Sequence, residues 1–205
     1  MKRHMLFLGV AFLAMGLFVH SRNAEAIRLL TNKEALKQMF PDVDQVVKET
    51  VTLTSAELTK VKARLGGHLV HFQAGSESEK VSETSTFTFY IGIKGNSRIR
   101  MAFIDEQPGK WGPVEFIIAL NTNPGKIHNL AVMSYQEKRG RPIARNNFLQ
   151  QFAGKGSSDQ ITLNKDIRAI SGATISSDAT CFAVKKAIAI FEEVYQSRTK
   201  AVSQK

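Results

Sequence analysis

Four β-strand patterns between residues 87 and 135 constrain the fold of this chain most strongly. The first two, Phe87–Ile93 and Arg98–Ile104, flank a Gly-Asn pair that tolerates positive φ, which is typical of a tight hairpin turn. The next two, Val114–Leu120 and Ile127–Tyr135, flank a turn that contains a Pro-Gly pair. Two consecutive hairpins with helical patterns around them predict an α+β fold, in which helices pack on an antiparallel sheet.

Helical patterns precede and follow the hairpins. Thr31 is a natural N-cap for a helix over residues 32–40, and residues 55–65 have a similar opening and apolar spacing. Residues 144–153 predict a helix with Phe148, Leu149 and Phe152 inward. The last long helix is expected over residues 177–197, because its apolar residues recur at steps of three and four. These residues are Ala179, Phe182, Ala183, Ala187, Ile190, Phe191 and Val194.

The remaining segments suggest how the chain divides. Residues 46–53 and 68–72 favour strands, residues 161–163 a short strand, and residues 74–85 a polar loop. We therefore expect an N-terminal cap region of helices and strands over residues 27–85, a core domain over residues 86–198 and a polar tail over residues 199–205.

Residues 1–26 have the three regions of a secretory signal peptide. Lys2 and Arg3 precede an apolar run over residues 5–19, and Ala24-Glu25-Ala26 forms an A-x-A cleavage site. The apolar run is shorter than the roughly 20 residues that a spanning helix needs. The pattern predicts export to the periplasm or to the outer face of the cytoplasmic membrane. An uncleaved membrane anchor is the alternative.

The chain is basic, with a formal net charge of +10. Cleavage after Ala26 would remove three basic residues and one acidic residue, which leaves +8. In an exported protein this charge favours an anionic membrane surface or an acidic redox protein as a partner, and it argues against nucleic acid. The alternative is that scattered lysines serve only solubility.

Few residues suggest metal binding or catalysis. Cys181 is the single cysteine, so no intrachain disulfide can form, and its place in the last helix predicts a small core residue. His68 and His71 lack a cysteine or acid at metal-ligand spacing, so no metal site is predicted. No catalytic residue is predicted, because no nucleophile elbow or Ser-His-acid set can be assembled.

The main functional signal is Ser-Gly-Ala-Thr at residues 171–174, directly before the last helical pattern. A helix N-terminus presents free N–H groups and about half a positive charge, so the loop before it suits a phosphate or a carboxylate. Gly172 and Ala173 let a ligand approach the backbone, and the Thr174 hydroxyl could be esterified to a phosphate. Ser176 or Ser177 is the expected N-cap. A loop and an N-cap without any ligand would use the same residue types, and this is the alternative.

Residues 171–174 resemble the S/T-G-A-T signature of the FMN-binding domain family. This family includes the G subunit of the Rnf complex and the C subunit of the sodium-pumping NADH:quinone reductase. In it a flavin transferase joins FMN through a phosphoester to the last Thr of the signature, which matches Thr174 here. The resemblance covers residues 87–195. It includes the turn at Trp111, a glutamate-glycine loop that begins at Glu137 and a helix that ends in Gln-Phe-Ala-Gly-Lys. The residues implied to bind FMN are Ser171, Gly172, Ala173, Thr174, Ser176, Ser177, Trp111 and Glu137.

Two positions depart from the family pattern. The family has an aspartate three residues before the signature, where this chain has Arg168, and the nearest acid is Asp166. The glutamate loop reads Glu-Lys-Arg-Gly-Arg-Pro from Glu137 onward instead of E-T-P-G-x-G. The resemblance therefore implies a divergent, exported flavoprotein that carries electrons through FMN attached at Thr174, and it favours electron transfer over a turnover enzyme without deciding between them. Its implied partners are a flavin transferase and a membrane or periplasmic redox protein. The alternative is an envelope module that binds FMN non-covalently or not at all.

Overall fold

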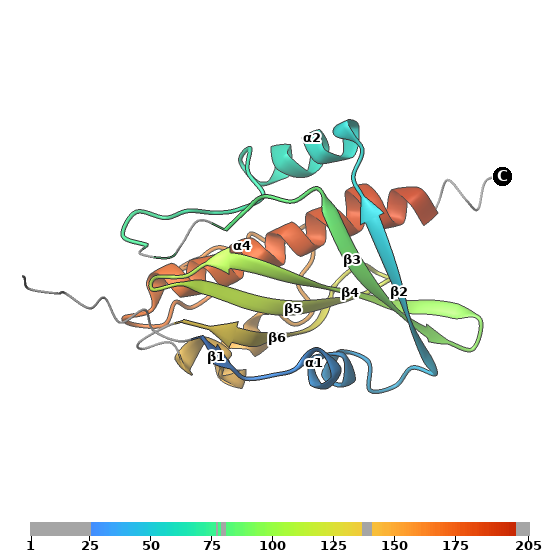
Figure 1. Cartoon of the computed structure of the whole chain (residues 1–205), viewed down its shortest axis with the longest axis horizontal. Coiled ribbons are helices and arrows are strands. Elements are labelled where there is room, and N and C mark those ends of the chain that lie inside the picture. Colours follow the sequence, from blue (N-terminus) through green and yellow to red (C-terminus); the bar gives the residue numbers. More distant parts are fainter. Residues whose placement is uncertain (1–25, 77, 79–80, 137–140, 200–205) are drawn as a thin grey trace, which may run out of the picture.

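A six-stranded antiparallel sheet forms the centre of the molecule (Figure 1). The computed structural model describes residues 26–76, 78, 81–136 and 141–199. The strand order is β1-β6-β5-β4-β3-β2, and every neighbouring pair is antiparallel. The strands are β1 (Ile27–Arg28), β2 (Gln45–Thr52), β3 (Thr86–Lys94), β4 (Ser97–Pro108), β5 (Pro113–Asn121) and β6 (Ile127–Tyr135). The two predicted hairpins are β3–β4 and β5–β6, so the predicted α+β class with an antiparallel sheet is confirmed.

The middle of the sheet is buried on both faces. Phe103 on β4 and Phe116 on β5 belong to the core beneath α4 (Thr174–Ile190), whereas Ala102 and Ile117 belong to the core beneath α1 (Asn32–Met39). Successive residues of a strand point to opposite faces, so strands covered on both sides need a continuous apolar run. The apolar runs of β4 and β5 therefore fit the two central strands.

The N-terminal segment supplies both edges of this sheet. β1 pairs with β6 at one edge, and β2 pairs with β3 along its whole length at the other. Residues 27–85, which we expected to form a cap region, thus share one sheet with the core strands.

Helices cover the two faces of the sheet, with α4 on one side and α1 on the other (Figure 1). α2 (Ser55–Arg64) lies on the outer side of α4 (Figure 1). Capping boxes at Thr31 and Thr54 start α1 and α2, as the Thr-x-x-Glu pattern favours. α4 continues as the π-helical segment η3 (Phe191–Gln196). All seven apolar residues predicted to face the core from this helix are buried, so that prediction is confirmed.

Three predicted elements were wrong. Residues 68–72 form no strand, because the Gln107 side chain bonds the His71 N–H and the Leu69 carbonyl in place of a neighbouring strand. Residues 144–153 do not form one helix. The chain there forms η1 (Arg141–Ala144), α3 (Asn146–Leu149) and η2 (Gln150–Phe152), although the three predicted side chains are buried. Asparagines favour helix termini over helix interiors, which fits the start of α3 at residues 146 and 147.

Residues 161–163 also form no strand, and only a single bridge joins Leu163 to Ile167. Ile161 has a φ of +47°, which is rare for a β-branched residue and breaks an extended run.

Within the described ranges, no helix combines the length and the apolar character needed to cross a membrane. The predicted signal peptide lies outside the described residues except for Ala26, and Glu137 and the tail beyond residue 199 also lie outside them.

Candidate functional site

The Ser-Gly-Ala-Thr segment forms the loop and first turn at the start of α4. Thr174 is the first helical residue, and Ala173 is the N-cap, with no side-chain hydrogen bond to the first turn. The prediction that Ser176 or Ser177 caps this helix was wrong, because the N-cap is Ala173, three to four residues earlier. The Ser177 hydroxyl donates to the Ala173 carbonyl at 2.8 Å and accepts from the Ile170 N–H at 3.3 Å. Both serines are buried, so their side chains are not open to solvent at the start of α4.

The exposed residues of this segment fit a phosphate. Ser171, Gly172 and Thr174 are exposed, and Ala173 is half-buried. Gly172 has a φ of +76°, and no atom lies within 4 Å of the position that a Cβ would take. A ligand can therefore approach the backbone at Gly172, next to a hydroxyl at the positive end of a 17-residue helix.

The loop before the segment is held by Asp166. Its carboxylate accepts the Thr162 N–H at 2.9 Å and the Ile161 N–H at 3.0 Å, and it pairs with Lys155 at 2.9 Å. Burial would raise the pKa of Asp166, but the Thr162 N–H, the Lys155 ammonium and the Ile161 N–H lower that pKa to about 2. Asp166 is therefore engaged in its own turn and does not replace the acid that is missing at residue 168.

Arg168 takes the position of that acid, and its main chain is held by Gln151. Gln151 holds its main chain from both sides: the Arg168 N–H donates to Oε1 at 2.8 Å, and Nε2 donates to the Arg168 carbonyl at 3.3 Å. A cleft of about 430 Å³ opens beside this contact. Its lining includes Arg145, Asn147, Phe148, Gln151, Arg168 and Ile170. No carboxylate lines the cleft, and neither arginine side chain has an ion-pair partner among the described residues.

A second loop lies over the first turns of α4. The His71 ring stacks on Phe182 with centroids 5.0 Å apart, and its Nε2 lies 3.1 Å from an Asp178 carboxylate oxygen. The Gln73 side chain donates to the Ile175 carbonyl at 2.9 Å. Asp178 is four residues after Thr174, so it lies one turn further along the same side of the helix. The pattern of residues 68–72 predicted only a strand, and nothing in the sequence predicted the contact between His71 and Asp178.

Trp111 lies in the β4–β5 loop, as predicted, and its ring is half-buried with the Lys110 ammonium 4.9 Å from the ring centroid. The Ser76 hydroxyl donates to the Gly109 carbonyl and so links this loop to the segment that covers α4. Gly112 packs on Gln136 so closely that a Cβ at this position would overlap the glutamine side chain. The Trp111 loop and the start of α4 therefore lie at the same end of the sheet, on the left in Figure 1. Glu137 follows Gln136 but lies outside the described residues.

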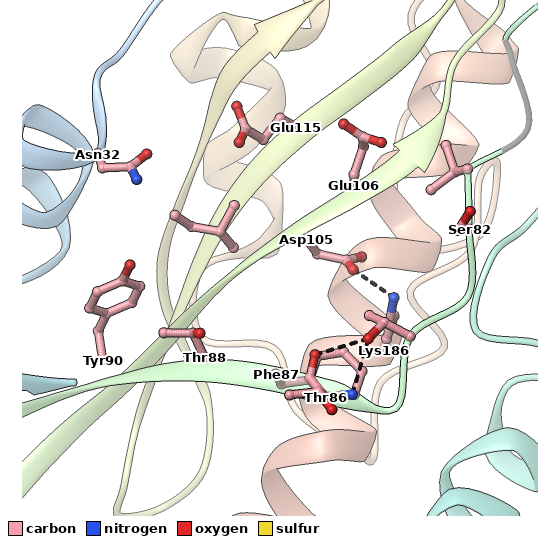
Figure 2. A pocket seen from close by; sticks show the side chains of 13 residues that line it. Asn32, Ser82, Thr86, Phe87, Thr88, Tyr90, Asp105, Glu106, Glu115 and Lys186 are labelled. Atoms are coloured by element: carbon pink, nitrogen blue, oxygen red, sulfur yellow. Dashed lines mark hydrogen bonds and ion pairs between the residues drawn. The ribbon is translucent and has the colours of Figure 1, made fainter. Parts of the chain in front are cut away.

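A larger cleft of about 680 Å³ opens where β3 and β4 diverge beyond the Phe89–Phe103 pair (Figure 2). On its lining the Lys186 ammonium pairs with Asp105 at 2.6 Å, and both side chains are at most 5% exposed. Glu106 and Glu115 also line it, and burial together with the Glu115 and Asp105 carboxylates raises the pKa of Glu106. Three carboxylates against one ammonium disfavour a phosphate. Of the two clefts, the smaller one beside Arg168 is therefore the one suited to an anion.

Cys181 is 1% exposed, and burial, assisted by the Asp178 carboxylate, raises its pKa to about 12. The predicted core role of this thiol is confirmed, because such a group is neither accessible nor ionised at neutral pH. No group of three or more potential ligands is placed to hold a metal ion within the ranges that the structure covers.

Part of the chain resembles known FMN-binding proteins. Residues 109–189 match the FMN-binding domain family, and this range includes Trp111, both arginines of the cleft and the first turns of α4. The chain is also 32% identical over 108 residues to the G subunit of the proton-translocating ferredoxin:NAD(+) oxidoreductase complex of Clostridium ljungdahlii. That alignment covers 49% of this chain and 57% of the relative, so the chain spans little more than half the length of the protein it matches.

The structure thus shows an α+β fold with an antiparallel sheet and packed helices, as expected for an FMN-binding domain. Residues 109–189 match the FMN-binding domain family, and this match supports FMN as the cofactor.

Proposed function

We propose that this protein is an exported flavoprotein that carries electrons through FMN esterified to Thr174. One observation supports this proposal above all others. The Thr174 hydroxyl is exposed on the first residue of α4, directly after an alanine N-cap, within the segment that matches the family.

The ester bond would need an enzyme. The helix terminus stabilises a neighbouring negative charge by typically 0.3–1 kcal/mol, and by up to about 2 kcal/mol when the charge is partly buried. This energy orients a phosphate but does not form a bond. A flavin transferase would join Thr174 Oγ to the phosphorus of FMN. The donor must be a flavin nucleotide whose phosphate is activated as an anhydride: the hydroxyl proton leaves, the anhydride P–O bond breaks and the second phosphate departs.

When bound, FMN supplies the redox chemistry, and the protein sets the position and environment of the ring. Trp111 is a candidate to stack on the ring, because it lies half-buried in a loop at the same end of the sheet as Thr174. Ser171, Gly172 and Ala173 would surround the phosphate. Glu137, which directly follows Gln136 in the sequence, remains a candidate for binding FMN.

Export and the electron partners belong to the same proposal. Residues 1–26 support export, because they combine a basic start, an apolar run and an A-x-A site. The relative is named as part of an oxidoreductase complex, which supports a membrane or periplasmic redox protein as the partner of this chain. The net charge of +10 would favour an acidic partner or an anionic membrane surface.

A second candidate is an envelope module that binds FMN non-covalently or not at all. The observation that favours it is Arg168, which reverses the charge at a position where the family has an acid, while Asp166 is committed to its own turn.

Mass spectrometry of intact protein, co-expressed with a flavin transferase, tests the proposal. An FMN-sized adduct is expected on the unmodified chain and on Ser171→Ala, and none on Thr174→Val. An adduct that persists in Thr174→Val would move the attachment to another residue. Absence of an adduct from the unmodified chain, under conditions in which the transferase modifies a standard substrate, would leave the second candidate ahead.

A further inference from the structure

The cleft between Arg145 and Arg168 is the feature that the ester linkage leaves unexplained. Two arginines line one small cleft, and its lining contains no carboxylate among the residues that the structure describes. Both side chains are exposed, so bulk water can solvate their charges without a ligand. What points to a ligand is therefore their place on the lining of one concave site, together with the support of that site and its other lining residues.

The two arginines come from separate segments that the structure fixes against each other. Arg145 directly precedes α3, and Arg168 lies on the loop that leads to the helix start. Gln151 joins these segments, because its amide bonds the main chain of Arg168 on both sides and also donates to the Phe148 carbonyl at 3.3 Å. The backbones that carry the two charges are therefore pre-organised, which reduces the entropy lost on binding.

The lining favours a small anion that carries an apolar or amphipathic group. Phe148 and Ile170 provide apolar surface, Asn147 provides an amide, and the arginines provide planar donors suited to phosphate oxygens. The volume of about 430 Å³ lies within the range of small-molecule sites.

We propose that this cleft is a phosphate-binding subsite, in which Arg145 and Arg168 hold the phosphate of a flavin nucleotide that is not esterified to Thr174. This proposal extends the proposed function, because it presupposes that the domain takes up FMN. It gives Arg168 a role: an acid at this position would repel the phosphate, whereas the arginine attracts it.

Comparison of FMN with riboflavin tests the subsite, because the two ligands differ only in the phosphate. Binding is measured by quenching of flavin fluorescence in a Thr174→Val background, in which no ester can form at that residue. We expect FMN to bind about tenfold or more tightly than riboflavin, as a charge-assisted contact implies. Inorganic phosphate should displace FMN, and added salt should weaken its binding.

Variants then locate the effect. Arg145→Gln together with Arg168→Gln should bring the affinity for FMN close to that for riboflavin. Lys165→Gln is the matched control, because it removes one positive charge from the same segment but does not line the cleft, and it should preserve most of the preference. The proposal is overturned if the double variant retains the preference, if Lys165→Gln abolishes it equally, or if the background protein binds neither ligand.

These outcomes are separate from those of the proposed function. A covalent adduct on the unmodified chain without any phosphate preference would support attachment at Thr174 and remove the subsite. A preference that depends on the arginines without an adduct would support the subsite and remove the ester.

Discussion

Removing one partner of the buried pair of Lys186 and Asp105 should cost more stability than removing one partner of any exposed ion pair among the described residues, and Lys186→Met tests this. The pair joins α4 to β4 at 2.6 Å, with 3% and 5% of the two side chains exposed (Figure 2). Removing one partner of such a pair costs about 3–5 kcal/mol, because the other charge stays buried without compensation. Gln107 donates to the same carboxylate at 2.8 Å, so we expect a loss of about 3 kcal/mol, near the lower end of that range.

Urea unfolding followed by circular dichroism measures this loss. Lys185→Met is the matched control: this neighbouring lysine is only half-buried and makes one 3.3 Å hydrogen bond to Thr162, so its loss should be below about 1 kcal/mol. The double variant Lys186→Met/Asp105→Leu should recover much of the stability, because no buried charge is left unpaired. A loss below about 1 kcal/mol in Lys186→Met, or a double variant no more stable than the single one, would refute the reasoning.

Three further predictions concern the packing and ionisation of α4 and its neighbours. Phe191→Ala should cost about 3–5 kcal/mol in urea unfolding, because the ring is fully buried; a loss below about 1 kcal/mol would contradict its place in the core. The Arg198 side chain, with smaller contributions from the Thr54 N–H and hydroxyl, lowers the pKa of Glu57 from 4.5 to about 2, so this stabilisation is complete above pH 4.5 and is lost as the pH falls toward 2. Arg198→Gln should therefore lose less stability than the unmodified protein between pH 5 and pH 3, and urea midpoints that fall equally would contradict this. Cys181 should react with a thiol reagent at neutral pH only in denaturant, and fast labelling of the native protein would show that the thiol is accessible.

The regular elements were predictable because local patterns determine them. The hairpins of β3–β4 and β5–β6 follow from alternating apolar residues and turn pairs, and α4 follows from apolar residues at helical spacing. The start of α4 was not predictable from the same rules. Ser177 bonds the carbonyl four residues back instead of capping the helix, and a serine can do either.

The site itself was predictable only in part. The sequence placed Thr174 at a helix start and Trp111 in a loop, and the structure brings those loops to one end of the sheet. Arg145 and Arg168 come to line one cleft only through tertiary structure, in which Gln151 bonds the main chain of a distant loop. The commitment of Asp166 to its own turn depends on the left-handed backbone at Ile161, which no residue type in that segment would suggest.

Peptide mapping of the protein co-expressed with a flavin transferase tests the central claim most directly. Trypsin cleaves after Arg168 and after Lys185, so one peptide, residues 169–185, contains the whole Ser-Gly-Ala-Thr segment and the first turns of α4. We predict an FMN-sized increment on this peptide, with fragment ions that assign it to Thr174. An increment assigned to any other residue, or an unmodified peptide under conditions in which the transferase modifies a standard substrate, would contradict this claim.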